Sequence, residues 1–185
     1  AAPTAVAPTP VPPTPTAKAP TSKGKIVVAI GAEPETMEPG HAQSQPLIMT
    51  LFNVVDRLVE RDPKTLQLRP SLAEKWDQVK PDTWRFSLRK GLKFQDGSPL
   101  NADAVVFNMN RLNDPQMRIQ ADFANLQQAK AVDEFTVDLT TKDTDPILPL
   151  RIMRALIESK KFIQENPELV PLQGVGTGPY KFVEW

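Results

Sequence analysis

Proline is distributed unevenly along this chain, and its distribution limits where an ordered fold can begin. Seven of the 20 prolines fall in residues 1–24, which otherwise consist mainly of Ala, Thr and Val, with only Lys18 and Lys23 charged. Proline has no backbone N–H to donate to a helix or sheet, and this stretch offers no periodic apolar face. We therefore predict a disordered, partly polyproline-II spacer over residues 1–24 and an ordered fold that begins at residue 25.

The composition excludes several classes of function. The 22 Lys and Arg residues balance the 22 Asp and Glu residues, so the chain has no net field that would attract nucleic acid or anionic lipid. Without cysteine it cannot form a disulfide framework, a thiolate zinc site or an iron–sulfur cluster. No run of sequence approaches the roughly 18 consecutive apolar residues of a membrane-spanning helix. We expect a soluble globular protein that does not bind nucleic acid.

Hydrophobic patterns after residue 25 indicate short strands that alternate with short helices. The apolar run at residues 26–30 stops at Gly31, which is typical of a buried strand. Apolar residues recur at helical spacing over 46–59, which predicts an amphipathic helix. Ser71 followed by Glu74 fits a capping box and predicts a short helical turn.

The clearest pattern lies in the middle of the chain. Apolar and polar residues alternate over 84–89 and over 135–140, which predicts two half-buried strands. Asn101 is expected to cap a helix whose buried face runs to Leu112. A second helix is predicted near residues 121–129.

The remaining signals concern turns, the last third of the chain and the aromatic residues. Lys-Gly at 90–91 and Asp-Gly at 96–97 predict turns. We predict a helix within residues 147–157 and a strand over 180–185. Three aromatic residues of the middle region are expected in the core: Trp76, Trp84 and Phe94.

Residue types that could carry catalysis are sparse. His41 is the only histidine, and it follows Pro39-Gly40 in an expected loop, so we interpret it as an ordinary polar residue. The glycines at 174–178 resemble a nucleotide-binding loop. Pro179 follows them directly, however, where phosphate binding would need a helix N-terminus. We therefore interpret this segment as a structural turn.

The acidic residues also lack the spacing of a known site. Glu33, Glu35 and Glu38 share one connection without the pattern of a calcium loop, and we interpret them as a solvated loop face. Residues 87–90 spell Ser-x-x-Lys, but on an expected strand and without the companion motifs of penicillin-recognising enzymes. We predict no catalytic residue, no metal site and no cofactor. A hydrolase that uses His41 or the acidic loop is kept as a rival hypothesis.

Residues 88–107 resemble the extracytoplasmic solute-binding proteins of peptide and nickel ABC importers, which are known as family 5. That family has Leu-Arg-x-Gly-x-x-Phe, then Asp-Gly-Ser/Thr-Pro, then a helix that opens with Thr/Asn-Ala-x-Asp-Val. The matching residues are Leu88, Arg89, Gly91, Phe94, Asp96, Gly97, Ser98, Pro99, Asn101, Ala102 and Val105. One departure is Ala104, where the family usually has Asp. Asp103 next to it can offset the missing charge in the first helical turn.

Three further segments resemble the same family in the same order. Residues 33–39 (EPETMEP) are similar to its E-P-x-T-L-D-P opening, and residues 70–76 (PSLAEKW) to its P-x-L-A-E-S-W. Residues 176–182 (GTGPYKF) match its G-T-G-P-Y segment. The resemblance therefore covers residues 25–185, and it implies a mixed α/β or α+β fold that forms the N-terminal lobe portion of a two-lobed periplasmic-binding-protein-like fold.

The resemblance also implies a division of the chain. Residues 25–40 would form the opening strand and connection of lobe I, and residues 41–174 an inserted α+β subdomain. Residues 175–185 would form the return strand to lobe I. Family members are much longer, so the whole second lobe is expected to lie outside these residues.

The implied function is capture of a peptide-like or other small solute outside the membrane and its delivery to an ABC permease. The implied ligand-binding residues are Gln43, Ser44 and Gln45, for which a solvated loop is the alternative reading. The resemblance also implies a periplasmic or extracytoplasmic monomer. A lipid anchor is a further option, because proline- and threonine-rich tails often follow the lipidated cysteine of such proteins. The alternative function is a free-standing α+β binding or interaction domain without a transport role.

Overall fold

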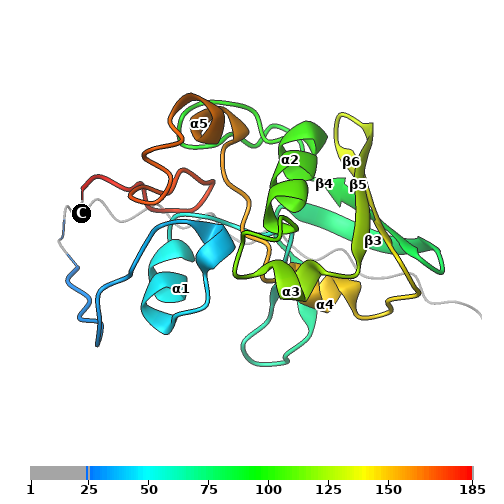
Figure 1. Cartoon of the computed structure of the whole chain (residues 1–185), viewed down its shortest axis with the longest axis horizontal. Helices are drawn as coiled ribbons and strands as arrows, with labels where there is room; N and C mark the ends of the chain where they lie inside the picture. The colour runs from blue at the N-terminus through cyan, green and yellow to red at the C-terminus, as the bar shows by residue number, and fades with distance from the viewer. Residues whose placement is uncertain (1–23, 25, 185) are drawn as a thin grey trace, which may run out of the picture.

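A computed structural model describes residue 24 and residues 26–184 of the chain (Figure 1). The spacer predicted over residues 1–24 lies outside these described residues, apart from Gly24. The helical elements are η1 Pro39–His41, α1 Gln45–Leu51, α2 Ala102–Leu112, α3 Gln120–Phe123, α4 Leu148–Ile152 and α5 Lys160–Glu165. The strands are β1 Val59–Arg61, β2 Leu68–Pro70, β3 Ala73–Lys80, β4 Thr83–Leu88, β5 Leu126–Asp133 and β6 Thr136–Thr141.

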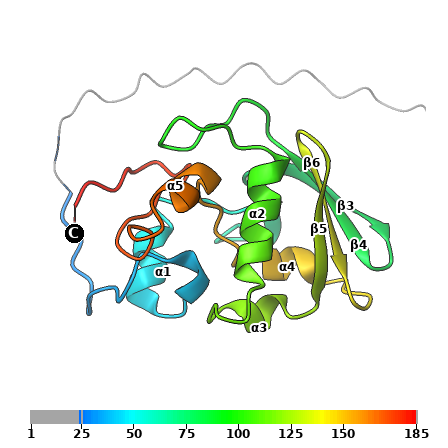
Figure 2. The same ribbon diagram turned by 45° about the horizontal axis from the view of Figure 1, so that its top comes forward.

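The main sheet is antiparallel, with strand order β3-β4-β6-β5, and β1 and β2 form a separate hairpin. The alternating patterns at 84–89 and 135–140 are confirmed as β4 and β6, which pair with Phe86 opposite Val137. One face of the sheet is buried, and α2 packs against this face. On its other side α2 faces α1 and α5 (Figures 1 and 2). The alternating pattern predicted these strands correctly because one face of the sheet is buried and the other is exposed to solvent.

The opposite face of the sheet carries a row of charges that alternate in sign. Asp77 lies opposite Arg85, Arg85 opposite Asp138, and Asp138 opposite Lys130 in the strand register. The Arg85 guanidinium donates to both carboxylate oxygens of Asp138, at 2.7 and 2.8 Å. Opposite charges on directly paired residues favour this register, and they leave the face polar.

The strands predicted at residues 26–30 and 180–185 are not present in the described residues. Neither segment has strand pairing, and residue 185 lies outside the description. Ile26, Val27 and Val28 are 77%, 78% and 70% exposed. A strand requires a neighbour that supplies a ladder of backbone hydrogen bonds. Among the described residues neither segment has such a ladder, and the Tyr180 N–H makes a single bond to the Asn53 carbonyl.

The helix predicted over 46–59 is much shorter, because α1 ends at Leu51. Its apolar residues are buried by two different parts of the fold. Leu47, Leu51, Val54 and Val55 pack in a small cluster with Met37 and Leu156, whereas Leu58 and Val59 belong to the main core beside the sheet. The helical spacing of apolar residues over 46–59 therefore arises by chance, because the residues before and after the end of α1 are buried in two different clusters.

Two further helix predictions were wrong or too long because strand pairing replaced them. Residues 71–74 lead into β3, which pairs with β4, so Glu74 lies on a strand rather than in a capping box. Within 121–129 only the end of α3 is helical, and β5 then pairs with β6. Long-range pairing decided these two segments, and local propensity did not. The helix predicted within residues 147–157 is present as α4, Leu148–Ile152.

The predicted turns and the predicted helix cap are confirmed. Gly91 and Gly97 have φ angles of +75° and +83°, a region that glycine adopts without strain. The Asn101 side-chain oxygen accepts the Ala104 N–H at 3.0 Å at the start of α2. Of the three aromatics expected in the core, Phe94 is buried, whereas Trp76 and Trp84 are half-buried and pack against the core. None of the helices in the described part of the chain is long and apolar enough to cross a membrane.

The cap leads to a stability prediction. Replacing Asn101 with alanine is expected to lower the free energy of unfolding by about 1 kcal/mol, because the N–H of Ala104 loses its acceptor. Urea unfolding would measure this loss. Asn110 lies exposed on the same helix, so Asn110→Ala serves as the control and should change stability by less than about 0.5 kcal/mol. Equal effects of the two substitutions would contradict the role of the cap.

Candidate functional site

The glycine segment, residues 174–180, lies directly against the backbone at residues 53–56. The Gly178 N–H donates to the Val54 carbonyl at 2.9 Å, and the Tyr180 N–H to the Asn53 carbonyl at 3.0 Å. A Cβ atom at Gly178 would lie 2.6 Å from the Val54 carbonyl carbon. The glycines are therefore required by close backbone approach, in agreement with the interpretation of this segment as a structural turn.

Gln95 joins this segment to the rest of the fold. Its backbone N–H donates to the Gly176 carbonyl at 2.9 Å. Its side-chain amide donates to the carbonyls of Gly178 and Tyr180, at 3.0 and 2.7 Å. Sequence reasoning missed Gln95, because a lone glutamine between two motif residues carries no signal of a contact more than 80 residues away.

The Asp-Gly-Ser-Pro turn lies beside Gln95 and fixes the start of α5. The Asp96 carboxylate accepts the Ser98 N–H at 2.9 Å and also the hydroxyls of Ser98 and Ser159. Ser159 in turn caps α5 by accepting the Phe162 N–H at 3.1 Å. Partial burial acts to raise the pKa of Asp96, but the hydrogen bonds from Ser159 and Ser98 outweigh it and the pKa is lowered. The turn and the glycine segment thus form one joint in the fold.

The predicted ligand-binding residues lie at the start of α1, and their side chains have different surroundings. The Ser44 hydroxyl accepts the Leu47 N–H at 3.4 Å and donates to Glu35 at 2.8 Å. The exposed Gln43 donates to the Arg118 carbonyl at 2.6 Å. Gln45 is exposed. The structure therefore brings Ser44 together with Glu35 as a helix cap, and leaves the two glutamines open to solvent.

An apolar groove of about 650 Å³ lies close to α1 and brings both ends of the described chain together. Its lining comes from residues 26–30, from the C-terminal end of α1 and from residues 180–184. None of residues 43–45 lines it. The exposed apolar residues along it include Ile26, Val28, Met49, Tyr180 and Val183.

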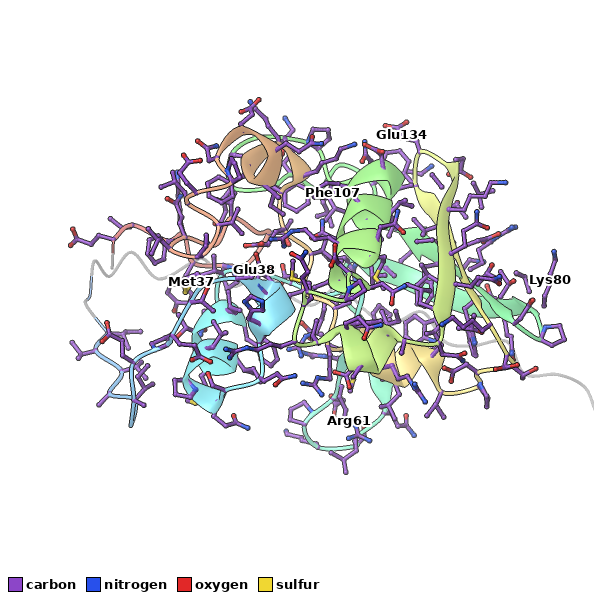
Figure 3. The ribbon with its side chains drawn as sticks, in the orientation of Figure 1. Met37, Glu38, Arg61, Lys80, Phe107 and Glu134 are labelled. Carbon is purple, nitrogen blue, oxygen red and sulfur yellow. The ribbon has the colours of Figure 1, made fainter. Side chains whose placement is uncertain are left out.

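The acidic loop is not uniformly solvated, so the interpretation of Glu38 was wrong. Glu38 is only 5% exposed, and both its oxygens pair with the guanidinium of Arg111 from α2, one of them at 2.7 Å. Figure 3 shows Glu38 beside Met37 at the entry to η1. Glu35 is more open and lies 4.0 Å from Arg118. The partner of Glu38 lies 73 residues along the chain, so spacing within the loop could not reveal it.

The described residues contain no group of three or more His, Asp or Glu side chains that could hold a metal ion. His41 is the last residue of η1 and is half-buried. The joint holds its segments together by the backbone contacts and hydrogen bonds described above.

Comparison with known proteins agrees with this arrangement. The family model of the bacterial extracellular solute-binding proteins, family 5 (middle region), matches residues 67–185, which is more than half of the chain. The chain belongs to this family. The match contains both the Asp-Gly-Ser-Pro turn and the glycine segment, so the two halves of the joint lie within the family 5 region.

Two curated relatives of this family 5 chain match most of its length. The peptide transport periplasmic protein SapA of Salmonella typhimurium is 31% identical over 187 residues, which cover 86% of this chain and 34% of SapA. The glutathione-binding protein GsiB of Escherichia coli O1:K1 / APEC is 30% identical over 170 residues, which cover 87% of this chain and 32% of GsiB. The chain thus spans about a third of the length of the relatives it matches.

Solved structures support the fold class. MoaA from A. tumefaciens R10, in complex with mannopinic acid, superposes with a TM-score of 0.75 at 27% identity, over 80% of this chain and 32% of MoaA. NikZ from Campylobacter jejuni, in complex with Ni(L-His), superposes with a TM-score of 0.73 at 22% identity, over 83% of this chain and 32% of NikZ. The family resemblance and the mixed α/β periplasmic-binding-protein fold are confirmed. Family 5 is a family of extracellular solute-binding transport proteins, not of enzymes.

Proposed function

We propose that this family 5 chain is part of the solute-binding component of an ABC importer, which captures a peptide-like or other small solute outside the membrane and delivers it to the permease. The match to the family 5 model over residues 67–185 carries this proposal. The relatives SapA and GsiB are a peptide transport protein and a glutathione-binding protein, which favours a peptide-like solute. Membership of this family also favours transport over a free-standing interaction domain and over a hydrolase.

The division of the chain follows as part of the same proposal. Residues 25–40 and 175–185 would belong to lobe I, and residues 41–174 to the inserted subdomain, after a spacer at 1–24. The apolar groove supports this division, because residues 26–30 and 180–184 line it together while their apolar side chains stay exposed. Two segments of this kind suit the edge of a sheet that is completed by further strands.

We assign solute contact to Gln43 and Gln45 at the start of α1. Both side chains are exposed, and uncharged amides suit recognition of peptide main chain or hydroxyl groups. Ser44 is expected to position them, because its hydroxyl is already committed to Glu35 and to the Leu47 N–H. As part of the proposal the protein works as a periplasmic or extracytoplasmic monomer, with or without a lipid anchor, and without catalysis or a cofactor.

Weak peptide binding by the chain would test this assignment. If a complete importer component binds at about 1 μM and this part supplies half of the free energy, the chain alone should bind at about 1 mM. Amide NMR spectra recorded with di-, tri- and oligopeptides should therefore show shifts around residues 43–45 at millimolar peptide. Gln43→Ala together with Gln45→Ala should remove these shifts.

Gln127 provides the matched control, because it is also an exposed glutamine but lies on β5, outside the segment that contains residues 43–45. Gln127→Ala should leave the peptide-induced shifts unchanged. Shifts that survive the double substitution would contradict the assigned contacts but not the family function. Micromolar binding by this chain alone would contradict the proposal that it is one part of a larger binding component.

A further inference from the structure

Glu158 is a buried carboxyl group that neither the fold motifs nor the proposed solute contact explains. It lies between α4 and α5 with 0% exposure. Neither of its carboxyl oxygens makes a hydrogen bond of good geometry. An ionised carboxylate that is buried without a partner is costly, so this position favours the neutral form of the carboxyl group.

The backbone around Glu158 is held on several sides, so its side chain cannot simply turn outward. The side chain of Asn108 on α2 donates to the Glu158 carbonyl at 2.8 Å and accepts the Glu158 N–H at 3.1 Å. The neighbouring Ile157 N–H donates to the Asp56 carbonyl, and the Ser159 N–H to the Val175 carbonyl, both at 2.9 Å. Moving Glu158 into solvent would break contacts to α2 and to the glycine segment together.

The charges that face Glu158 do not balance if it is ionised. On α2, Arg111 follows Asn108 by three residues, and Asn108 holds the Glu158 backbone, so the two side chains share one face of the helix. Glu38, at the entry to η1, pairs through both of its oxygens with the Arg111 guanidinium. Glu38 also accepts the Gly40 N–H at 2.9 Å.

The other described segments around Glu158 bring charged groups that have partners of their own. Arg57, which forms a β-bridge with Leu156, donates to the Met153 carbonyl at 3.5 Å. The glycine segment contributes Gly-Val-Gly-Thr-Gly over residues 174–178 and no ionisable side chain there. On α5, Lys160 pairs with Asp103 at 2.6 Å. Beside the glycine segment, the Asp56 carboxylate accepts the Thr177 hydroxyl at 2.7 Å. Among the described residues, Arg111 is therefore the cation that acts on both buried carboxyl groups, Glu38 and Glu158.

We propose that Glu158, Arg111 and Glu38 form a proton-controlled cluster that holds α2 to the glycine segment. A protonated Glu158 keeps α2 and the glycine segment in contact, and loss of its proton loosens that contact. With Glu158 neutral, Arg111 balances Glu38 and no unpaired charge is buried. With Glu158 ionised, the cluster carries a net negative charge that is largely shielded from water. This inference does not depend on the proposed transport function.

The electrostatics agree with the geometry. Burial raises the pKa of Glu158 well above its usual value and the Glu38 carboxylate raises it further, while Arg111 and the Val175 backbone N–H act in the opposite direction. A carboxyl whose pKa is higher in the folded than in the unfolded chain binds more protons when folded. Its contribution to stability is therefore fully present below the unfolded pKa, and it is lost as the pH rises through the folded pKa.

Glu158→Gln in the full chain tests the proposal, because glutamine keeps the shape and cannot ionise. Urea unfolding of wild type and E158Q would be compared from about pH 5 to about pH 9. The folding equilibrium of the wild type should fall relative to E158Q by about tenfold per pH unit between the unfolded and the folded pKa of Glu158. Glu168, exposed in the loop after α5, is the control, and E168Q should run parallel to wild type. Parallel profiles for wild type and E158Q would overturn the proposal.

A second measurement does not depend on how E158Q folds. Carboxyl ¹³C NMR of the wild-type chain with labelled glutamate should show one carboxyl that titrates well above the others. Amide exchange at Ser159 and Gly178 should become faster, relative to amides in the main sheet, over the same pH range. Titration of every glutamate in the ordinary acidic range would overturn the proposal. It would also be overturned if amide exchange at Ser159 and Gly178 did not change as Glu158 titrates.

Discussion

Gly176→Ala is expected to destabilise the chain by about 3 kcal/mol or more. The added Cβ would lie 2.5 Å from the Val55 Cα and even closer to the carbonyl oxygen of Val54. Both obstacles are backbone atoms, which cannot rotate away as the end of a side chain can. The glycine segment would have to move off residues 53–56, and this would also strain the bond from the Gln95 N–H to the Gly176 carbonyl. Urea or thermal unfolding would measure the loss.

Gly174 offers a control in the same segment. A Cβ there would lie 3.5 Å from a Val54 methyl and 3.6 Å from the Met37 methyl, which is ordinary van der Waals contact. Gly174→Ala should therefore change the free energy of unfolding by less than about 1 kcal/mol. Comparable losses for the two substitutions would mean that close backbone approach is not what requires glycine at 176.

Family motifs and strand alternation predicted much of the region around this segment. Asn101, Gly91 and Gly97 have the cap and turn roles expected from local chemistry, which depends only on neighbours a few residues away. The strands at 84–89 and 135–140 were predictable because one sheet face is buried. Residues 26–30 and 180–184 failed the same test, since apolar composition cannot show whether a strand finds a partner among the described residues.

The buried contacts of the site could not be predicted from spacing. Glu38 was assigned to solvent because the loop around it is polar, and its partner Arg111 lies on a helix 73 residues later. Gln95 and Glu158 carry no motif signal of their own, yet one joins the glycine segment to the fold and the other lies unpaired beneath it. The exposure of Gln43 and Gln45 was foreseeable from their polarity, whereas the hydrogen bond from Ser44 to Glu35 depends on how the loop returns to α1.

Arg111→Met is expected to be the other severe substitution, with a loss of about 3–5 kcal/mol in the free energy of unfolding. Methionine keeps the volume of the arginine stem, so the loss measures the charge and its hydrogen bonds. The side chains of Arg111 and Glu38 are 18% and 7% exposed, so water cannot replace the guanidinium. Arg118 is the matched control, because its side chain is 61% exposed and 4.0 Å from Glu35, and Arg118→Met should cost less than about 1 kcal/mol.

The relative losses in the free energy of unfolding distinguish a simple Arg111–Glu38 pair from a three-residue cluster that includes Glu158. Glu38→Gln should cost about 1–3 kcal/mol, less than Arg111→Met, because Glu158 remains close enough to balance the guanidinium. Removing both carboxyls with E38Q and E158Q leaves Arg111 as the uncompensated charge. The loss in that double variant should therefore exceed the sum of the two single losses. If the two substitutions are additive, Glu158 does not share Arg111 with Glu38, and the cluster is an ordinary ion pair beside an unrelated buried acid.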